Sequence, residues 1–250
     1  MLKIAHIINP VKVEKSSDLY FAQPITFETI RIAKEFVENQ DQLKVTLYSA
    51  QFEEDGDLVP NFFKKTTNLE RSVLDLGTFK IKRKLPILKD ILDNLFQSSA
   101  ADYFVYTNAD IGLMPHFYLA INKIITEGYD ALVINRRTIS AAYQQVNEIP
   151  LMYAQIGEPH IGHDCFVLKR EVYPEYKLGN VCIGIRLVGR VLLWNLLAYS
   201  KKFKEFKNLH LTFHLGQNKP WKNPGLKDYD DFNKNEARKV LQYLNRKHDF

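Results

Sequence analysis

The pattern that most constrains this chain is a regular alternation of short apolar runs and amphipathic stretches through its first half. The apolar runs that suit buried strands are residues 2–8, 43–49, 103–107 and 131–135. Between them, stretches that begin near Pro24, Pro86 and Pro115 carry apolar residues three and four apart, as helices with one buried face do. Strands joined through helices form right-handed crossovers, so the sequence predicts an α/β fold, with a mostly parallel, Rossmann-like central sheet flanked by helices.

The rest of the chain is less regular. Asn233 and Glu236 have the spacing of a capping box, and the apolar stripe that follows indicates a closing helix. One domain is expected over residues 1–250. The other expected elements are a loop over 52–68, a short strand over 73–76, a loop over 138–163, a strand over 165–168, a buried helix near 187–199 and a strand over 209–214.

Composition excludes several classes of protein. The chain has 250 residues, a formal net charge of +5 and nearly as many acids as bases, which does not call for a nucleic-acid partner and suits an anionic substrate such as a nucleotide diphosphate. Its two cysteines, Cys165 and Cys182, support neither a disulfide framework nor a zinc site, so a reducing cytoplasm is expected. No apolar run reaches the length of a membrane span, which leaves peripheral membrane contact as the alternative.

The most informative stretch is the apolar run 103–107, which leads directly into Asn108 and Asp110. Open α/β sheets bind their ligands at the carboxyl ends of strands. Two oxygen-bearing side chains two residues apart at such an edge can hold a hard divalent cation, which neutralises a diphosphate leaving group. The plainer alternative is that these residues only start a turn.

Three later stretches also carry polar side chains in suggestive places. His163 and Asp164 precede the strand at 165–168, although Asp164 could simply cap a turn or pair with Lys169. Alternation places His214 on the polar face of the strand at 209–214. Trp221 lies near the end of a section, residues 201–222, with six lysines and one acid, which could close over a diphosphate or be a solvated basic surface.

The tripeptide Asn108-Ala109-Asp110 after a buried strand resembles the Asp-x-Asp motif of glycosyltransferases with the GT-A fold, of the family 2 type. The resemblance implies a nucleotide-binding half over residues 1–135, and an acceptor-side half with the closing helix over 136–250. It implies transfer of a sugar from a nucleotide-diphosphate sugar to a saccharide or other hydroxyl acceptor, with Mn²⁺ or Mg²⁺ as cofactor. An amide at Asn108 holds a cation less well than a carboxylate, so Lys219, Lys222 or the basic run 82–84 could neutralise the leaving group instead.

The resemblance also implies roles for particular residues. Asp110 would contact the metal or the donor phosphates, Asn108 would face the donor's ribose or sugar, and His214 would be a further metal ligand. Asp164 would act as general base or bind sugar hydroxyls, beside His163 and Trp221 on the acceptor. The remaining donor contacts would be Asn9, Pro10, Arg83 and Lys84.

Two other classes of function remain open. One is a non-catalytic nucleotide- or sugar-binding protein of the same fold. The other is a nucleotidyltransferase. That class normally carries a glycine-rich basic loop directly after its first strand, whereas residues 11–15 after Pro10 contain no glycine. No Walker loop, dinucleotide glycine fingerprint, nucleophile elbow or His-Glu-x-x-His helix occurs.

Overall fold

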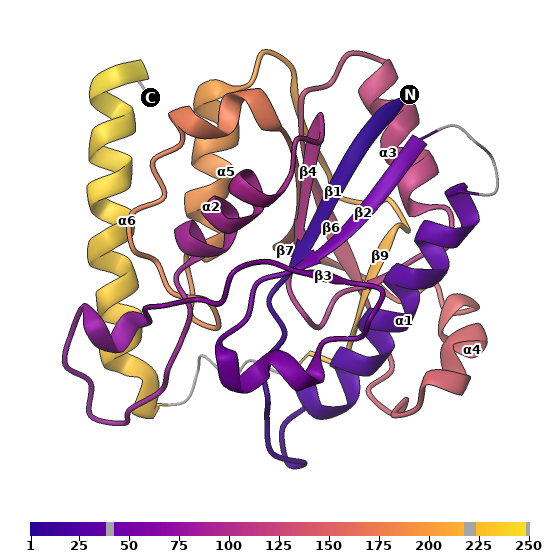
Figure 1. Ribbon diagram of the computed structural model, residues 1–250, viewed down its shortest axis with the longest axis horizontal. Coiled ribbons are helices and arrows are strands. Elements are labelled where there is room, and N and C mark those ends of the chain that lie inside the picture. The colour runs from indigo at the N-terminus through magenta and orange to yellow at the C-terminus, as the bar shows by residue number, and fades with distance from the viewer. Residues whose placement is uncertain (39–42, 218–223, 249–250) are drawn as a thin grey trace.

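The computed structural model describes residues 1–38, 43–217 and 224–248, and builds them around one nine-stranded mixed sheet (Figure 1). The strands are β1 (Leu2–Ile8), β2 (Leu43–Ser49), β3 (Lys64–Lys65), β4 (Tyr103–Thr107), β5 (Gly112–Leu113), β6 (Ala131–Ile139), β7 (Glu158–Lys169), β8 (Phe203–Phe206) and β9 (Thr212–Leu215). The α-helices are α1 (Leu19–Glu38), α2 (Leu88–Ser98), α3 (Phe117–Thr126), α4 (Ile149–Tyr153), α5 (Val188–Tyr199) and α6 (Lys227–His248).

The strand order is β3-β2-β1-β4-β7-β6-β9-β5, and β8 also pairs with β6. Strands β1, β2, β3 and β4 are mutually parallel, and β6 is parallel to β8 and β9. Strand β7 lies antiparallel between β4 and β6, which makes those two strands point the same way. The predicted α/β fold with a mostly parallel sheet is therefore confirmed, with β7 and β5 as the antiparallel exceptions.

Helices cover both faces of the sheet (Figure 1). On one face α2, α5 and α6 pack on side chains such as Phe104 and Phe166, and on the other α1 and α3 pack on side chains such as Val105 and Val167. Successive strand residues point to opposite faces, so uninterrupted apolar runs such as 103–107 are what a sheet buried on both sides requires. No helix within the described residues is both long and apolar enough to cross a membrane.

Strand β6 has two different neighbours along the same edge. Its first part, Ala131 to Ile134, pairs with β8, and its last part, Arg137 to Ile139, pairs with β9. Its pairing with β7 is irregular over the same stretch, with register shifts on either side of Asn135. Asn135 and Arg136 therefore lie where the sheet divides, and such irregularities re-aim side chains.

Several sequence predictions of local structure are wrong in detail. Residues 73–75 form a 3-10 helix, η2 (Val73–Asp75), because Ser72 and Asp75 cap each other. The expected loop over 138–163 contains η3 (Val146–Glu148), α4 and the first half of β7, which extends well before 165. Pro24 lies inside α1 rather than at its start.

The predicted capping box at Asn233 and Glu236 is also wrong, because both residues lie inside α6. Asn233 Oδ1 accepts the backbone N–H of Cys182 at 2.9 Å, and Glu236 Oε2 accepts that of Asn180 at 2.9 Å. These side chains therefore accept hydrogen bonds from backbone N–H groups in the segment before α5, and not from those at the start of a helix.

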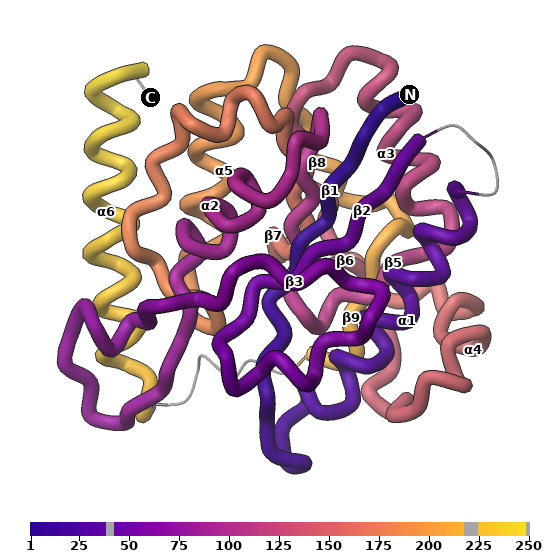
Figure 2. The backbone as a smooth tube through the Cα atoms, viewed as in Figure 1, coloured from indigo at the N-terminus to yellow at the C-terminus, as the bar shows by residue number. Residues whose placement is uncertain are grey.

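Figure 2 shows the long connection between β2 and α2 reaching the start of α6, where Phe79 and Tyr229 stack with ring centroids 4.0 Å apart.

His6 of β1 is fully buried, and its side chain faces α3. His6 Nδ1 is 2.6 Å from the hydroxyl of Tyr118, and His6 Nε2 is 2.9 Å from Oγ1 of Thr107. Burial disfavours the imidazolium and lowers the pKa of His6 from 6.5 to about 3. The core therefore holds a neutral histidine at pH 7.

We predict that this histidine makes the fold sensitive to mild acid. Unfolded His6 takes up a proton as the pH falls through 6.5, whereas folded His6 stays neutral down to about 3. Its contribution to the free energy of unfolding is complete above pH 6.5 and falls by about 1.4 kcal/mol per pH unit below it. Urea titrations at pH 7, 6 and 5 should show a smaller loss with pH in His6→Gln than in the wild type. The exposed His116→Gln is the control, and equal pH slopes in wild type and His6→Gln would contradict the prediction.

Candidate functional site

The candidate site lies where parallel strands of the sheet end together. The carboxyl ends of β1, β4, β6 and β9 share one edge because these strands point the same way. The polar side chains near those ends are Asn9, Asn108, Asp110, Asn135, Arg136 and His214, and the middle of β7 brings His163 and Asp164 to the same edge.

The structure brings together the two residues predicted as metal ligands. His214 Nε2 is 3.2 Å from Asp110 Oδ2, although 104 positions separate the two residues in the sequence. The side chains are 11% and 27% exposed, so the pair is sheltered but open on one side. Burial alone would raise the pKa of Asp110, but the hydrogen bond and charge of His214, with Arg136 nearby, outweigh it and lower the pKa below its ordinary value.

The hydrogen bonds of His214 limit where its protons can be. Its Nδ1 is 2.9 Å from the carbonyl oxygen of Gly216, which can only accept, so Nδ1 carries a proton. In the neutral ring, Nε2 is then an acceptor facing the Asp110 carboxylate, and Asp110 Oδ1 is buried without a hydrogen-bond partner among the described residues. Two facing acceptors require a positive centre, supplied either by a proton on Nε2 or by a cation.

A second polar group joins β4, β6 and β7. Asp164 Oδ1 accepts the side-chain amide of Asn108 at 3.0 Å, and Asp164 Oδ2 accepts Nη1 of Arg136 at 2.7 Å. Asn108 Oδ1 in turn accepts the hydroxyl of Tyr106 at 3.1 Å. The side chains of Arg136 and Asp164 are only 7% and 14% exposed, so this is a buried ion pair with both carboxylate oxygens in use.

A third group forms around Glu205 on β8. Its Oε1 lies 3.2 Å from Nε2 of His163 and accepts the side-chain amide of Asn135 at 3.0 Å. Helix α5 closes over this group, since a Cβ added at Gly189 would lie 2.6 Å from the carbonyl oxygen of His163. The residue two positions before Gly189, Leu187, has a left-handed φ of 79°. The start of α5 thus fits closely against His163.

The predicted donor contacts lie apart from these three groups. Asn9 donates its amide to the carbonyl oxygen of Ala50 at 2.7 Å and so joins the ends of β1 and β2, with Pro10 next to it. Lys84 pairs with Glu54 at 2.6 Å, and the backbone N–H of Arg83 donates to the hydroxyl of Tyr229 at 2.7 Å. Within the described residues, none of these side chains forms a hydrogen bond or ion pair with Asp110. The predicted acceptor contact Trp221 lies outside the described residues, as do Lys219 and Lys222.

Sequence reasoning missed Arg136, Asn135 and Glu205. A signal for the first two was present, because Asn-Arg-Arg directly follows the apolar run that begins β6, as Asn108 directly follows the apolar run of β4. Glu205 is the single acid in the lysine-rich section 201–222, which marks it as unusual there. Within the parts of the chain that the structure describes, no three His, Cys, Asp or Glu side chains gather closely enough to hold a metal by themselves.

Comparison with known proteins connects this geometry to a fold. The chain matches no protein-family model and no curated protein sequence. Among solved structures it is similar to S. aureus TarS 1-349 in complex with UDP-GlcNAc, with a TM-score of 0.54 and 6% identity over 89% of this chain and 61% of TarS 1-349. It is similar to mannosyl-3-phosphoglycerate synthase from Rubrobacter xylanophilus, with a TM-score of 0.54 and 13% identity over 98% of this chain and 74% of that one.

A third similar structure is glucosyl-3-phosphoglycerate synthase from Mycobacterium tuberculosis in complex with Mn²⁺, UDP and glucosyl-3-phosphoglycerate. Its TM-score is 0.53, with 12% identity over 100% of this chain and 81% of that one. These likenesses show that the chain has the fold of GT-A nucleotide-sugar glycosyltransferases, which confirms the fold predicted from the sequence. The chain spans about three-fifths of the length of TarS 1-349.

We predict that Gly189→Ala disturbs the site through packing. The added methyl group would lie 2.6 Å from the carbonyl oxygen of His163, so α5 or β7 must shift. Such overpacking costs about 1–3 kcal/mol of the free energy of unfolding, to be measured by urea denaturation. Gly56→Ala is the matched control because nothing lies within 4 Å of its added Cβ. Equal stability of the two variants would show that α5 does not fit against His163 as described.

Proposed function

We propose that this protein is a glycosyltransferase that moves a sugar from a nucleotide-diphosphate sugar to an acceptor hydroxyl. The observation that carries the proposal is the Asp110–His214 pair at the carboxyl edge of β4 and β9, in a chain with the GT-A fold. Fold alone does not define function, so this site is what distinguishes a glycosyltransferase from a binding protein of the same fold.

Asp110 and His214 fit a divalent cation such as Mn²⁺ or Mg²⁺. Asp110 has a buried oxygen without a partner among the described residues, and the Nδ1–H of His214 is fixed by Gly216, which leaves its Nε2 lone pair for a ligand bond. Two protein ligands suit an ion that also binds substrate phosphates. When bound, the ion would supply positive charge for the diphosphate leaving group. Asn108 would not add a ligand in this arrangement, because its oxygen accepts Tyr106 and its amide donates to Asp164.

The remaining residues divide between the donor and the acceptor. Asn9, Pro10, Arg83 and Lys84 are proposed to contact the donor nucleotide, as the resemblance implies. Arg136 is a buried permanent cation close to Asp110, which favours an anionic diphosphate beside it.

On the acceptor side, we assign His163 and Trp221 as contacts. Both oxygens of Asp164 are occupied by Asn108 and Arg136. Of the two roles expected for Asp164, these hydrogen bonds favour accepting from N–H groups and sugar hydroxyls over acting as the general base. The half over residues 136–250 would thus supply the acceptor side.

Calorimetric titration with UDP, GDP, CDP and dTDP, each with and without Mn²⁺, tests the proposal. We expect one nucleotide to bind with Mn²⁺, and Asp110→Asn to weaken that binding at least about tenfold because it removes a charged ligand. Glu70→Gln, at an exposed position, is the control and should bind like the wild type. If none of the four nucleotides binds, the glycosyltransferase proposal fails.

A further inference from the structure

The hydrogen bonds of His163 leave one ring nitrogen able to take a proton. The Glu205 carboxylate can only accept, so the ring nitrogen facing it at 3.2 Å, Nε2, must carry the hydrogen. In the neutral ring the lone pair is then on Nδ1. Among the described residues, none pairs with Nδ1 of His163, whereas both carboxylate oxygens of the neighbouring Asp164 are in use.

The carboxylate partner of His163 is itself held in place. Glu205 accepts the side-chain amide of Asn135 at 3.0 Å and has Lys207 Nζ at 3.9 Å, and these contacts orient its carboxylate toward the ring. A carboxylate that holds the N–H of an imidazole fixes the tautomer and stabilises the imidazolium that forms on proton uptake.

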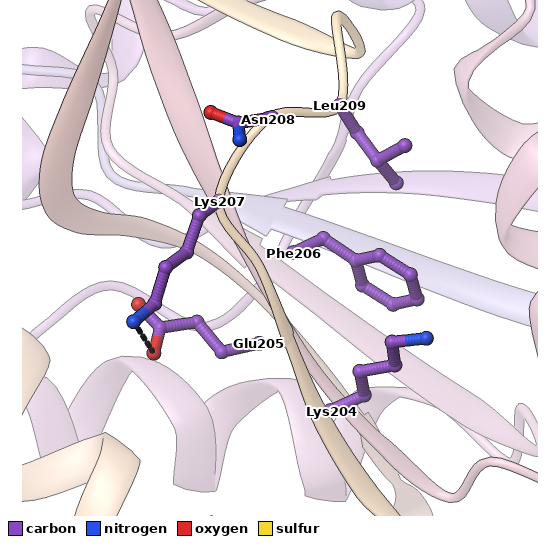
Figure 3. Close-up of a pocket in the computed structure, with 6 residues that line it drawn as sticks. All are labelled: Lys204, Glu205, Phe206, Lys207, Asn208 and Leu209. Atoms are coloured by element: carbon purple, nitrogen blue, oxygen red, sulfur yellow. Dashed lines mark ion pairs between the residues drawn. The ribbon is translucent and has the colours of Figure 1, made fainter.

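The pair is also open to a substrate. The side chains of His163 and Glu205 are 18% and 23% exposed. Glu205 lines a surface recess of about 370 Å³ formed by residues 204–209, and Figure 3 shows Glu205 and Lys207 pointing to one side of the strand while Phe206 points to the other. Helix α5 packs against the backbone of His163 at Gly189. Such a half-buried, oriented imidazole is well placed for proton transfer.

We propose that His163 is the general base of the reaction and that Glu205 is its positioning residue; this inference rests on the proposed glycosyltransferase function. Nδ1 of His163 takes the proton of the acceptor hydroxyl as its oxygen forms a bond to the anomeric carbon of the donor. The bond from that carbon to the diphosphate oxygen breaks, and the nucleoside diphosphate leaves with the electron pair. The proton remains on His163, opposite the Glu205 carboxylate, until it passes to solvent.

Donor hydrolysis, with water as the acceptor, tests the base without knowledge of the natural acceptor. The probes are UDP-glucose, UDP-N-acetylglucosamine and GDP-mannose, with release of the nucleoside diphosphate measured in the presence of Mn²⁺. We expect His163→Ala to lower kcat at least about a hundredfold, and Glu205→Gln about tenfold, while the Kd for the nucleoside diphosphate stays within twofold. Added imidazole should restore His163→Ala at least about tenfold, and the exposed His116→Ala should match the wild type.

Three outcomes would overturn the proposal. The first is a turnover of His163→Ala within about threefold of the wild type. The second is a loss matched by an equal loss of nucleotide affinity, without rescue by imidazole. The third is a wild type that binds a nucleoside diphosphate but releases none from any of the three donors. That result would reject His163 as the general base while leaving the proposed nucleotide site intact. Failure of all nucleotide binding would instead defeat the proposed function itself.

A measurement on the protein alone decides the tautomer. Nitrogen-15 correlation spectra of the histidine rings should place the proton of neutral His163 on Nε2, and Glu205→Gln should shift the signal of that nitrogen. A proton on Nδ1 in the neutral ring would overturn the proposal whatever the kinetics. His163→Ala assigns the signal, and thermal denaturation of each variant separates loss of the ring from loss of the fold.

Discussion

The candidate site depends on the buried ion pair between Arg136 and Asp164. Through it, with the amide of Asn108, the ends of β4 and β6 are joined to β7, which lies antiparallel between them. Removing one member of such a pair leaves a buried charge alone and is far more costly than removing both. The same contact holds Asn108 and Arg136 beside Asp110. Without these hydrogen bonds, so many polar side chains would not lie close together in a largely buried position.

The hydrogen-bond partners of His214 and His163 leave a different ring nitrogen available in each residue. His214 donates from Nδ1 to a backbone carbonyl, which turns Nε2 toward Asp110 and suits a metal ligand. His163 donates from Nε2 to a carboxylate, which leaves Nδ1 for a proton. The residue type is the same, and the partner on the far side of each ring decides its chemistry. His6, whose two ring nitrogens both face hydroxyl groups, is held neutral in the core.

The sequence predicted the framework well because it is encoded by local periodicity. The strands at 2–8, 43–49 and 103–107 were identified with the bounds that the structure has, since continuous apolar runs are needed where both faces are covered. Asp110 and His214 were each predicted as metal ligands through the resemblance alone, and the structure places His214 Nε2 3.2 Å from Asp110 Oδ2. Arg136 and Glu205 were missed because their orientation depends on register shifts in β6 and on pairings more than 25 residues away in the sequence, which no local pattern encodes. Asn233 and Glu236 misled for a related reason: their capping spacing serves tertiary contacts to residues 180–182.

The division of β6 between β8 and β9 has a consequence for how such proteins diversify. Strands β8 and β9 are each short and are tied to different parts of β6, so the segment between them, residues 207–211, crosses no ladder of its own. Leu211 is buried and its carbonyl oxygen accepts the backbone N–H of Met114, but the exposed Lys207 and Asn208 can change, and residues can be inserted beside them, at small cost because loop closure costs rise slowly with added residues. This segment lies between Glu205 and His214. Changes there would reshape the surface recess beside Glu205 while leaving both strands in place.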